Sequence, residues 1–249
     1  MPKNKELDRI LFIPDQHFPY NDKRYWRLLI KVAQCIKFDT IVILGDFIDC
    51  YTVSSHSKDP RRMLSLKQEI QTAKVAIKQL EALGAKRYIY TEGNHEDRLW
   101  RYIKDKAPEL VGGVTVEELL GLKQGPWEFI PYRQSAKVGK IHVIHDIGRA
   151  GVNAMRGTLL EMQDNTVFGH THRLGVIYDG TVTGVTRVCL NAGWGGDVET
   201  IDYQHRLKAV KDSMLGFGIG YMESNGVVHC QAVPVIKYKV VVEGQLIKG

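Results

Sequence analysis

Short runs of apolar residues alternate with helix-spaced apolar patterns through the first half of the chain. Three runs predict strands, at residues 10–14, 40–44 and 87–91. Two amphipathic stretches predict helices, at residues 24–35 and 65–83, the second ending at Gly84. Strands that are apolar on both faces and alternate with helices indicate a sheet covered on both sides. The first half is therefore predicted to be α/β.

Strands dominate the second half. They are expected at residues 128–131, 140–145, 166–169, 175–179 and 186–190, with one helix near 153–162. Asn225-Gly226 is a strong hairpin signal between residues 216–223 and 227–233, and Glu243-Gly244 predicts a second hairpin, so hairpins should fill about 216–247. Two segments, about 50–64 and 98–126, lie outside this framework and are predicted to be loop or helical insertions. We expect one domain over residues 1–249 with two sheets.

Composition narrows the class of protein. The chain has 249 residues, of which 44% are hydrophobic and 25% charged, as in globular proteins with a substantial core. Its longest apolar runs are far shorter than the roughly 18 residues that a membrane span needs. The charged N-terminus lacks the apolar stretch of a secretory signal, so a cytoplasmic protein is expected, with its four scattered cysteines reduced. The net charge of +6 is a weak indication of an acidic partner such as nucleic acid.

Five polar clusters directly follow predicted strands. They are Asp15-Gln16-His17, Gly45-Asp46-Phe47-Ile48-Asp49, Gly93-Asn94-His95-Glu96-Asp97, His145-Asp146 and Gly169-His170-Thr171-His172. The fold should gather them at one edge of the sheets, because sites in α/β proteins lie at strand ends. Carboxylate and amide oxygens together with several imidazoles suit manganese, zinc, iron or nickel, and are too rich in histidine for a magnesium or calcium cage.

The spacing within the clusters adds a geometric expectation. If the chain remains extended, residues two apart point to the same side, so Asp15 and His17 can face one site, and His170 and His172 can likewise face one site. Asp46, at the end of an apolar strand, could bridge two cations with its two oxygens. Two metals about 4 Å apart are the usual arrangement for displacement at phosphorus.

The order of the five clusters resembles the calcineurin-like metallophosphoesterase superfamily, which includes purple acid phosphatases, protein serine/threonine phosphatases and Mre-type nucleases. The motifs D-x-H, G-D-x-x-D, G-N-H-E, a single H and G-H-x-H run from Asp15 to His172. The resemblance implies an α/β, four-layer fold in which two mixed β-sheets pack as a sandwich flanked by helices. His145-Asp146 departs from the His-Gly of many relatives. Asn191-Ala192-Gly193 resembles a turn of compact bacterial or phage-type phosphodiesterases.

The resemblance also implies a role for each residue of the clusters. Asp15, His17 and His172 would hold one divalent ion, Asn94, His145 and His170 a second, and Asp46 would bridge them. Manganese is favoured, with iron, zinc and nickel left open. His95 would protonate the leaving oxygen or stabilise its charge, oriented by Glu96 or Asp97. Asp49 and Asp146 would not bind the ions themselves but would contact the side chains that do.

The implied activity is hydrolysis of a phosphodiester or phosphomonoester by a hydroxide held between the metals, with DNA or RNA as possible substrates. The alternatives are a small-molecule or protein phosphomonoesterase and, from another class, a non-catalytic scaffold on the same fold. No membrane partner is expected. The candidate substrate contacts, drawn from the two insertions, are His56, Arg61, Arg62 and Arg98, with Arg101 and Lys104 beside them.

Overall fold

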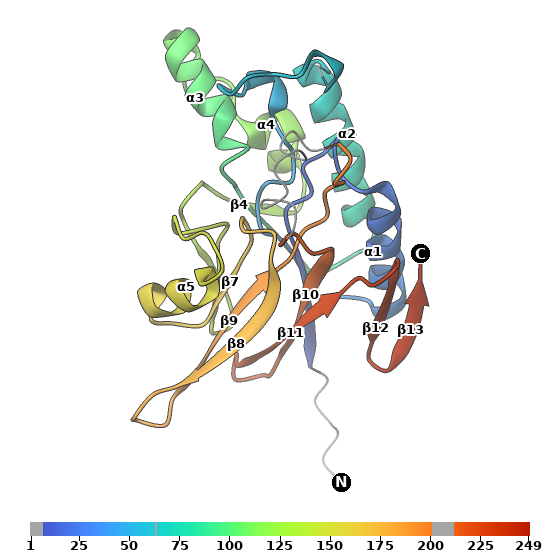
Figure 1. The fold of residues 1–249 in the computed structure, drawn as a ribbon, viewed down its shortest axis with the longest axis vertical. Coiled ribbons are helices and arrows are strands. Elements are labelled where there is room, and N and C mark those ends of the chain that lie inside the picture. The colour runs from blue at the N-terminus through green and yellow to red at the C-terminus, as the bar shows by residue number, and fades with distance from the viewer. Residues whose placement is uncertain (1–6, 63, 201–211) are drawn as a thin grey trace.

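The computed structural model describes residues 7–62, 64–200 and 212–249 (Figure 1). Its first sheet is mixed. In spatial order its strands are β11 (Val228–Pro234), β10 (Gly216–Met222), β1 (Asp8–Ile13), β2 (Thr40–Ile43), β3 (Arg87–Thr91) and β4 (Trp127–Ile130). Strands β1 to β4 are parallel, whereas β10 runs antiparallel to β1 and β11 antiparallel to β10. The carboxyl ends of four neighbouring strands therefore share one edge.

The second sheet is also mixed. Its strands, in spatial order, are β5 (Ala136–Val138), β6 (Ile141–Val143), β7 (Thr166–Phe168), β9 (Thr186–Ala192) and β8 (Leu174–Gly180). The three central strands are parallel, and the two edge strands are antiparallel to their neighbours. The sequence pattern did not predict β5, because a strand of three residues is too short to show a period.

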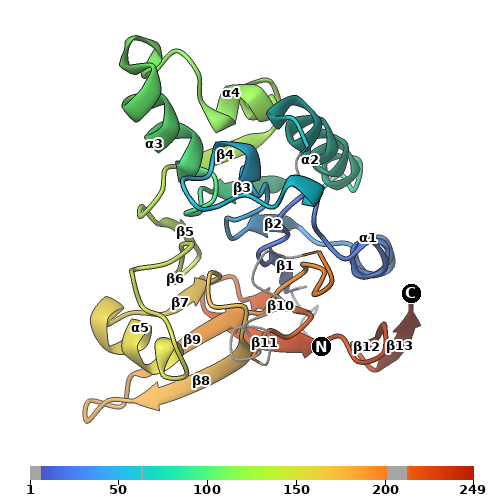
Figure 2. The ribbon, with the colours of Figure 1, turned by 45° about the horizontal axis from the view of Figure 1, so that its top comes forward.

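The two sheets face each other across an apolar core. Ile10, Phe12 and Val42 of the first sheet lie in the same buried cluster as Val143 and Leu190 of the second. Helices α1 (Lys23–Ile36) and α2 (Leu66–Glu81) cover the outer face of the first sheet, and α5 (Ala154–Met162) covers the second (Figure 2). The order helix, sheet, sheet, helix confirms the predicted fold class.

Local sequence explains where the two long helices begin. The Asp22 side chain accepts from the backbone N–H groups of Arg24 and Tyr25 and so caps α1. Ser65 and Gln68 form a capping box at the start of α2. The apolar faces of both helices are buried against the sheet, which provides most of the stabilisation of amphipathic helices.

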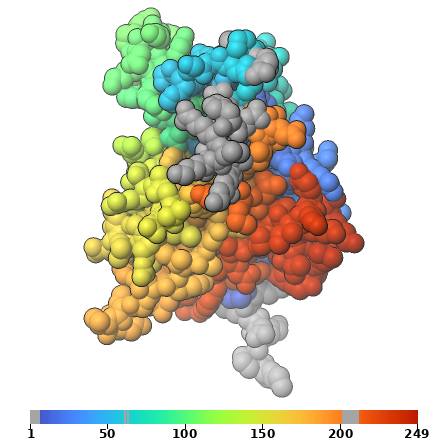
Figure 3. Space-filling model, in the orientation of Figure 1, coloured from blue at the N-terminus to red at the C-terminus, as the bar shows by residue number. Residues whose placement is uncertain are grey.

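The two segments predicted as insertions meet at one end of the molecule. Residues 50–62 contain 3-10 turns at Tyr51–Val53 and Pro60–Arg62. The other segment holds α3 (Asp97–Lys106), α4 (Val116–Leu120) and 3-10 turns at Pro108–Leu110 and Leu122–Gln124. Helix α3 contacts the turn at Tyr51–Val53, and Figure 3 shows the two segments adjoining at the top of the molecule.

Two hairpins complete the chain where Asn225-Gly226 and Glu243-Gly244 predict turns. Strands β10 and β11 form the first, and β12 (Lys239–Val242) pairs with β13 (Gln245–Lys248) in the second, which lies beside α1. Within the described ranges, the helices are too short or too polar for any of them to cross a membrane.

Candidate metal centre

The five polar clusters converge where the two sheets meet. Asp15, Asp46 and Asn94 follow β1, β2 and β3 of the first sheet, whereas His145 and His170 follow β6 and β7 of the second. Hydrogen bonds connect the two groups, since the His170 backbone N–H donates to Asp15 Oδ1 at 3.0 Å. Within the first sheet, the His95 N–H donates to Asp46 Oδ1 at 2.8 Å. The clusters are thus held in one fixed arrangement.

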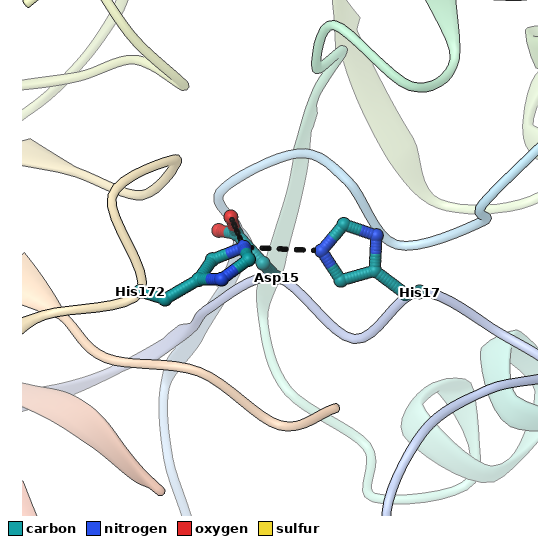
Figure 4. Close-up of side chains that lie close together, drawn as sticks. All are labelled: Asp15, His17 and His172. Carbon is teal, nitrogen blue, oxygen red and sulfur yellow. Dashed lines mark hydrogen bonds and ion pairs between the residues drawn. The ribbon is translucent and has the colours of Figure 1, made fainter. Parts of the chain in front are cut away.

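One group of donor atoms comes from Asp15, His17 and His172 (Figure 4). The Nε2 atoms of the two imidazoles lie 3.3 Å apart, and His172 Nε2 lies 3.3 Å from Asp15 Oδ2. Asp15 Oδ2 is buried and has no hydrogen-bond donor among the described residues. The Trp194 ring stacks on His172 with a centroid distance of 5.2 Å. An orphaned carboxylate oxygen facing two imidazole nitrogens is well suited to bind a cation.

A second group comes from Asp46, His145 and His170, with Asn94 between them. His145 Nδ1 donates to the Leu44 carbonyl at 2.7 Å, and its Nε2 lies 2.9 Å from Asn94 Oδ1. His170 Nδ1 is also 2.9 Å from that oxygen, and Asp46 Oδ1 is 3.4 Å from His145 Nε2. The carbonyl fixes a proton on Nδ1, which leaves Nε2 of the neutral ring available as a ligand.

The charges at the site favour a cation. Burial opposes protonation of His145, but the carboxylates of Asp46, Asp15 and Asp146 outweigh it and raise the His145 pKa to about 10. At Asp46, burial favours the neutral acid, yet the imidazoles of His145 and His95 hold the carboxyl pKa well below its usual range. The low pKa keeps the buried Asp46 carboxylate ionised, so its charge is available to a cation. The donor set fits two divalent ions.

The backbone at the site is not extended. His17, Asp46, His170 and His172 all have positive φ angles, of 55°, 47°, 67° and 58°. The condition of an extended chain is therefore not met, and the turn between His170 and His172 directs them to different groups, as in the assignment that the family resemblance implies. His170 faces the Asn94 group, whereas His172 faces the Asp15 group. Asp15 and His17 do point to the same group, although not through an extended chain.

Asp49, rather than Glu96 or Asp97, orients His95. His95 Nδ1 lies 3.2 Å from the Asp49 carbonyl and 3.6 Å from Asp49 Oδ2. Arg98 donates to Asp49 Oδ1 at 3.0 Å, and its other terminal nitrogen is 3.0 Å from His95 Nε2. Because a guanidinium can only donate, His95 Nε2 accepts and the ring proton lies on Nδ1.

Glu96 has a different role from the one expected of it. Its buried carboxylate accepts from the backbone N–H groups of Asp46 (2.9 Å), Phe47 (2.8 Å) and Ile48 (3.2 Å). It also accepts from Tyr90 Oη at 2.7 Å and from the Gly93 N–H at 3.0 Å. Asp97 instead pairs with Arg101 at 2.8 Å. The turn into α3 points these carboxylates away from the imidazole of His95, so the expectation that either orients it was wrong.

The residues predicted to contact the substrate do not all lie at the same place in the structure. His56 and Arg98 line a cavity beside Asn94 and His170. Arg62 instead stacks between the rings of Tyr20 and Tyr51, at 4.3 and 4.5 Å from their centroids. Arg62 therefore packs the 50–62 segment against the body of the protein. The side chain of Arg61 lies outside the described part of the chain.

Asp146 lies beside His145 of the second donor group. Its Oδ2 is 3.9 Å from His145 Nε2, and its Oδ1 accepts from the Gly148 N–H at 2.6 Å.

Sequence reasoning missed Trp194, which stacks on His172, and Tyr132 and Arg133, which line the cavity. A signal for the latter pair was present, because they follow the carboxyl end of β4, a parallel strand.

We compared the sequence with models of known protein families. Residues 8–174 match the model of the calcineurin-like phosphoesterases. The chain belongs to this family. All the residues grouped above, from Asp15 to His172, lie within the matched region of this calcineurin-like phosphoesterase. No curated protein sequence matches the chain.

Solved structures of low sequence identity resemble this calcineurin-like phosphoesterase along most of its length. Vacuolar protein sorting 29 from Cryptosporidium parvum is 15% identical, with 97% of this chain and 95% of that one covered and a TM-score of 0.48. Vps29 from Chaetomium thermophilum is 13% identical, with 92% and 87% covered and a TM-score of 0.49. The phosphoesterase YfcE from E. coli is 13% identical, with 92% and 100% covered and a TM-score of 0.45.

Proposed function

We propose that this protein is a phosphodiesterase that uses two divalent metal ions. The observation that carries the proposal is the pair of donor groups, Asp15, His17 and His172 on one side and Asn94, His145 and His170 on the other. Asp46 stands beside the second group and within reach of His95. Manganese is the proposed metal, with iron, zinc and nickel as alternatives.

Two divalent ions, when bound, would activate water and neutralise charge on the phosphate. The chain's own residues supply the rest. Asp15, Asn94 and the four histidines His17, His145, His170 and His172 would hold the ions. Asp46 carries one oxygen toward His145 and the other toward His95, which is 3.8 Å away. This distance supports a position for His95 beside the phosphate that such ions would hold.

Positive charge at the leaving group would come from the Arg98 guanidinium, which His95 and Asp49 hold in place. Arg98 is held by Asp49 and donates to His95 Nε2, so its charge lies at the edge of the proposed metal site. With Nε2 accepting that bond, the arrangement supports charge stabilisation more directly than proton donation from Nε2. Asp49 contacts both His95 and Arg98 and so fixes their side chains relative to each other.

A diester substrate, with DNA or RNA strands as the proposed class, is supported by charge. The chain carries a net charge of +6, and bound cations would offset the buried carboxylates of Asp15 and Asp46. Arginines Arg98 and Arg101 stand next to Asn94, where a strand could continue from the reacting phosphate. Electrostatic attraction of this kind is the main source of affinity for polynucleotides.

Hydrolysis of bis-p-nitrophenyl phosphate with manganese tests the proposal. The wild type should cleave it, and Asp46→Asn and His95→Ala should lower kcat by at least about 100-fold, as is usual for loss of a charge-stabilising group. Arg27→Gln, an exposed position on α1, is the matched control and should keep full activity. Wild-type protein with two bound metals that cleaves neither this diester nor p-nitrophenyl phosphate would refute the enzyme assignment. Cleavage of the monoester alone would favour a phosphomonoesterase.

A further inference from the structure

A cavity of about 560 Å³ opens directly beside the Asn94 group of the metal centre. Asn94 and His170 form the wall that it shares with that group, and His56 lines it from the 50–62 segment. Its volume falls within the roughly 300 to 1,000 Å³ of sites for small molecules. The cavity can therefore hold a group of about nucleotide size that continues from the metal centre.

Three arginines line this cavity. Arg98 and Arg101 project from α3, and Arg133 follows β4 from the other side. Among the described lining residues, Asp97 is the acidic one, and its carboxylate pairs with Arg101 at 2.8 Å. The cavity therefore keeps an excess of positive charge, and arginine is well matched to phosphate oxygens because its planar fork can donate two parallel bonds.

Two of these arginines are held in place by the metal centre itself. Arg101 donates to the Asn94 carbonyl at 2.9 Å, and Arg98 donates to Asp49 and His95. Arg133 is exposed and lies over the Tyr132 ring, with its guanidinium carbon 5.2 Å from the centroid. The three guanidinium groups thus place positive charge on the lining that the cavity shares with Asn94 and His170.

We propose that this cavity binds a second phosphate of the substrate, so that preferred substrates carry another phosphate next to the one that reacts. The proposal rests on the proposed diesterase function of the adjacent metal centre. Arg133 is the specificity residue within it, because it is exposed and belongs to neither donor group of the metal centre. The second phosphate could come from a terminally phosphorylated oligonucleotide or from a nucleoside polyphosphate.

Paired dinucleotides that differ by one phosphate test this proposal. We compare kcat/KM for the thymidine dinucleotide dTpdT with its 5′-phosphorylated and 3′-phosphorylated forms, in manganese, for wild type and Arg133→Gln. The wild type should favour one phosphorylated form by about ten-fold, the size of one charge-assisted hydrogen-bond pair. Arg133→Gln should lose most of that preference and still cleave bis-p-nitrophenyl phosphate at the wild-type rate. Arg27→Gln, which removes the same charge elsewhere, should keep the preference.

The possible results distinguish a failure of the second-phosphate site from a failure of the proposed diesterase function. If the wild type cleaves bis-p-nitrophenyl phosphate, treats all three dinucleotides alike and is inhibited no more strongly by ADP than by AMP, the second-phosphate site is wrong and the diesterase stands. An equal loss on all substrates in Arg133→Gln also contradicts the site. If no diester is cleaved, the proposed function itself fails. Inhibition by ADP that is stronger than inhibition by AMP, and lost in Arg133→Gln, would assign the cavity to nucleoside polyphosphates. A dinucleotide preference that Arg133→Gln loses, with inhibition by neither nucleotide, would assign it to oligonucleotides.

Discussion

Asp46 and Glu96 each hold the main chain of the other's loop. Asp46 Oδ1 accepts from the His95 N–H, and the Glu96 carboxylate accepts from the N–H groups of Asp46, Phe47 and Ile48. Asp46 has a φ of 47°, a conformation that a non-glycine residue adopts only when its surroundings fix it. Glu96 is therefore a positioning residue for the proposed bridging carboxylate.

Glu96→Gln tests that role. An amide offers one acceptor oxygen, and its NH2 group would face backbone donors, so the variant should lose about 1 to 3 kcal/mol of the free energy of unfolding. It should also bind manganese more weakly than the wild type. Urea unfolding and calorimetric titration measure the two effects. Glu161→Gln, an exposed position on α5, should change neither. Unchanged manganese affinity in Glu96→Gln would remove the positioning role.

The sequence predicted which residues offer donor atoms better than it predicted where their side chains point. The candidate ligands stand out in the sequence because carboxylate, amide and imidazole donors rarely cluster after five strands. Which neighbour supports His95 could not be predicted, since Glu96 and His95 are adjacent in sequence and point apart in space. The contact of Arg98 with His95 arises from the first turn of α3, whose start the sequence leaves undefined.

At the level of elements, one buried carboxylate ties the 50–62 segment to α2. Glu69 accepts from the backbone N–H groups of Tyr51 and Thr52, both at 2.9 Å. Arg62 stacks on Tyr20 and Tyr51 from the other end of the segment. His56, which lines the cavity, lies between these two anchors. The insertion is thus attached at both ends and presents its middle to the site.

The Glu69 anchor should make stability depend on pH. Burial raises the Glu69 pKa above its ordinary value of 4.5, although bonds from Thr52 and Tyr51 oppose the shift. A raised pKa means that the folded state binds the proton more tightly, so this contribution is full below about pH 4.5 and is lost as pH rises through the folded value. Glu69→Gln removes the dependence. The Tm of the variant minus that of wild type should therefore increase from pH 5 to pH 8, and a constant or falling difference would contradict this.

Elements with a strong local signal were predicted, and those without one were not. The two amphipathic helices and the Asn225-Gly226 hairpin follow from spacing and turn chemistry. Strand β5 was missed because Ala136 and Val138 give too few buried positions to reveal a strand. The pairing of β1 with β10, far apart in sequence, is set by long-range packing.

For the molecule as a whole, the site connects the two sheets. Asp15, Asp46 and Asn94 come from the first sheet, whereas His145, His170 and His172 follow strands of the second. Ions bound by both sets would link the two halves of the sandwich.

The family and the four-layer order could be predicted from the cluster order, but the arginine-lined cavity could not, because it forms only where α3, the end of β4 and the 50–62 segment meet.

Metal binding should therefore stabilise the whole fold. Manganese at 100 times its Kd would add about 2.7 kcal/mol to the free energy of unfolding, or roughly 5 to 10 °C in Tm for a chain of this size. Thermal unfolding with manganese and with EDTA measures the shift. Asp46→Asn should show a much smaller shift. Equal Tm values for the wild type in manganese and in EDTA would contradict a metal that connects the sheets.

The left-handed backbone at His17, Asp46, His170 and His172 has an evolutionary consequence. Each of these positions has a positive φ, and our proposal also requires a metal-ligating side chain there. Glycine and asparagine adopt a positive φ more readily than histidine does. If selection for activity were relaxed, the requirement for a ligand would vanish and the requirement for a positive φ would remain. We expect inactive descendants of this chain to drift toward glycine and asparagine at these positions while keeping the same fold.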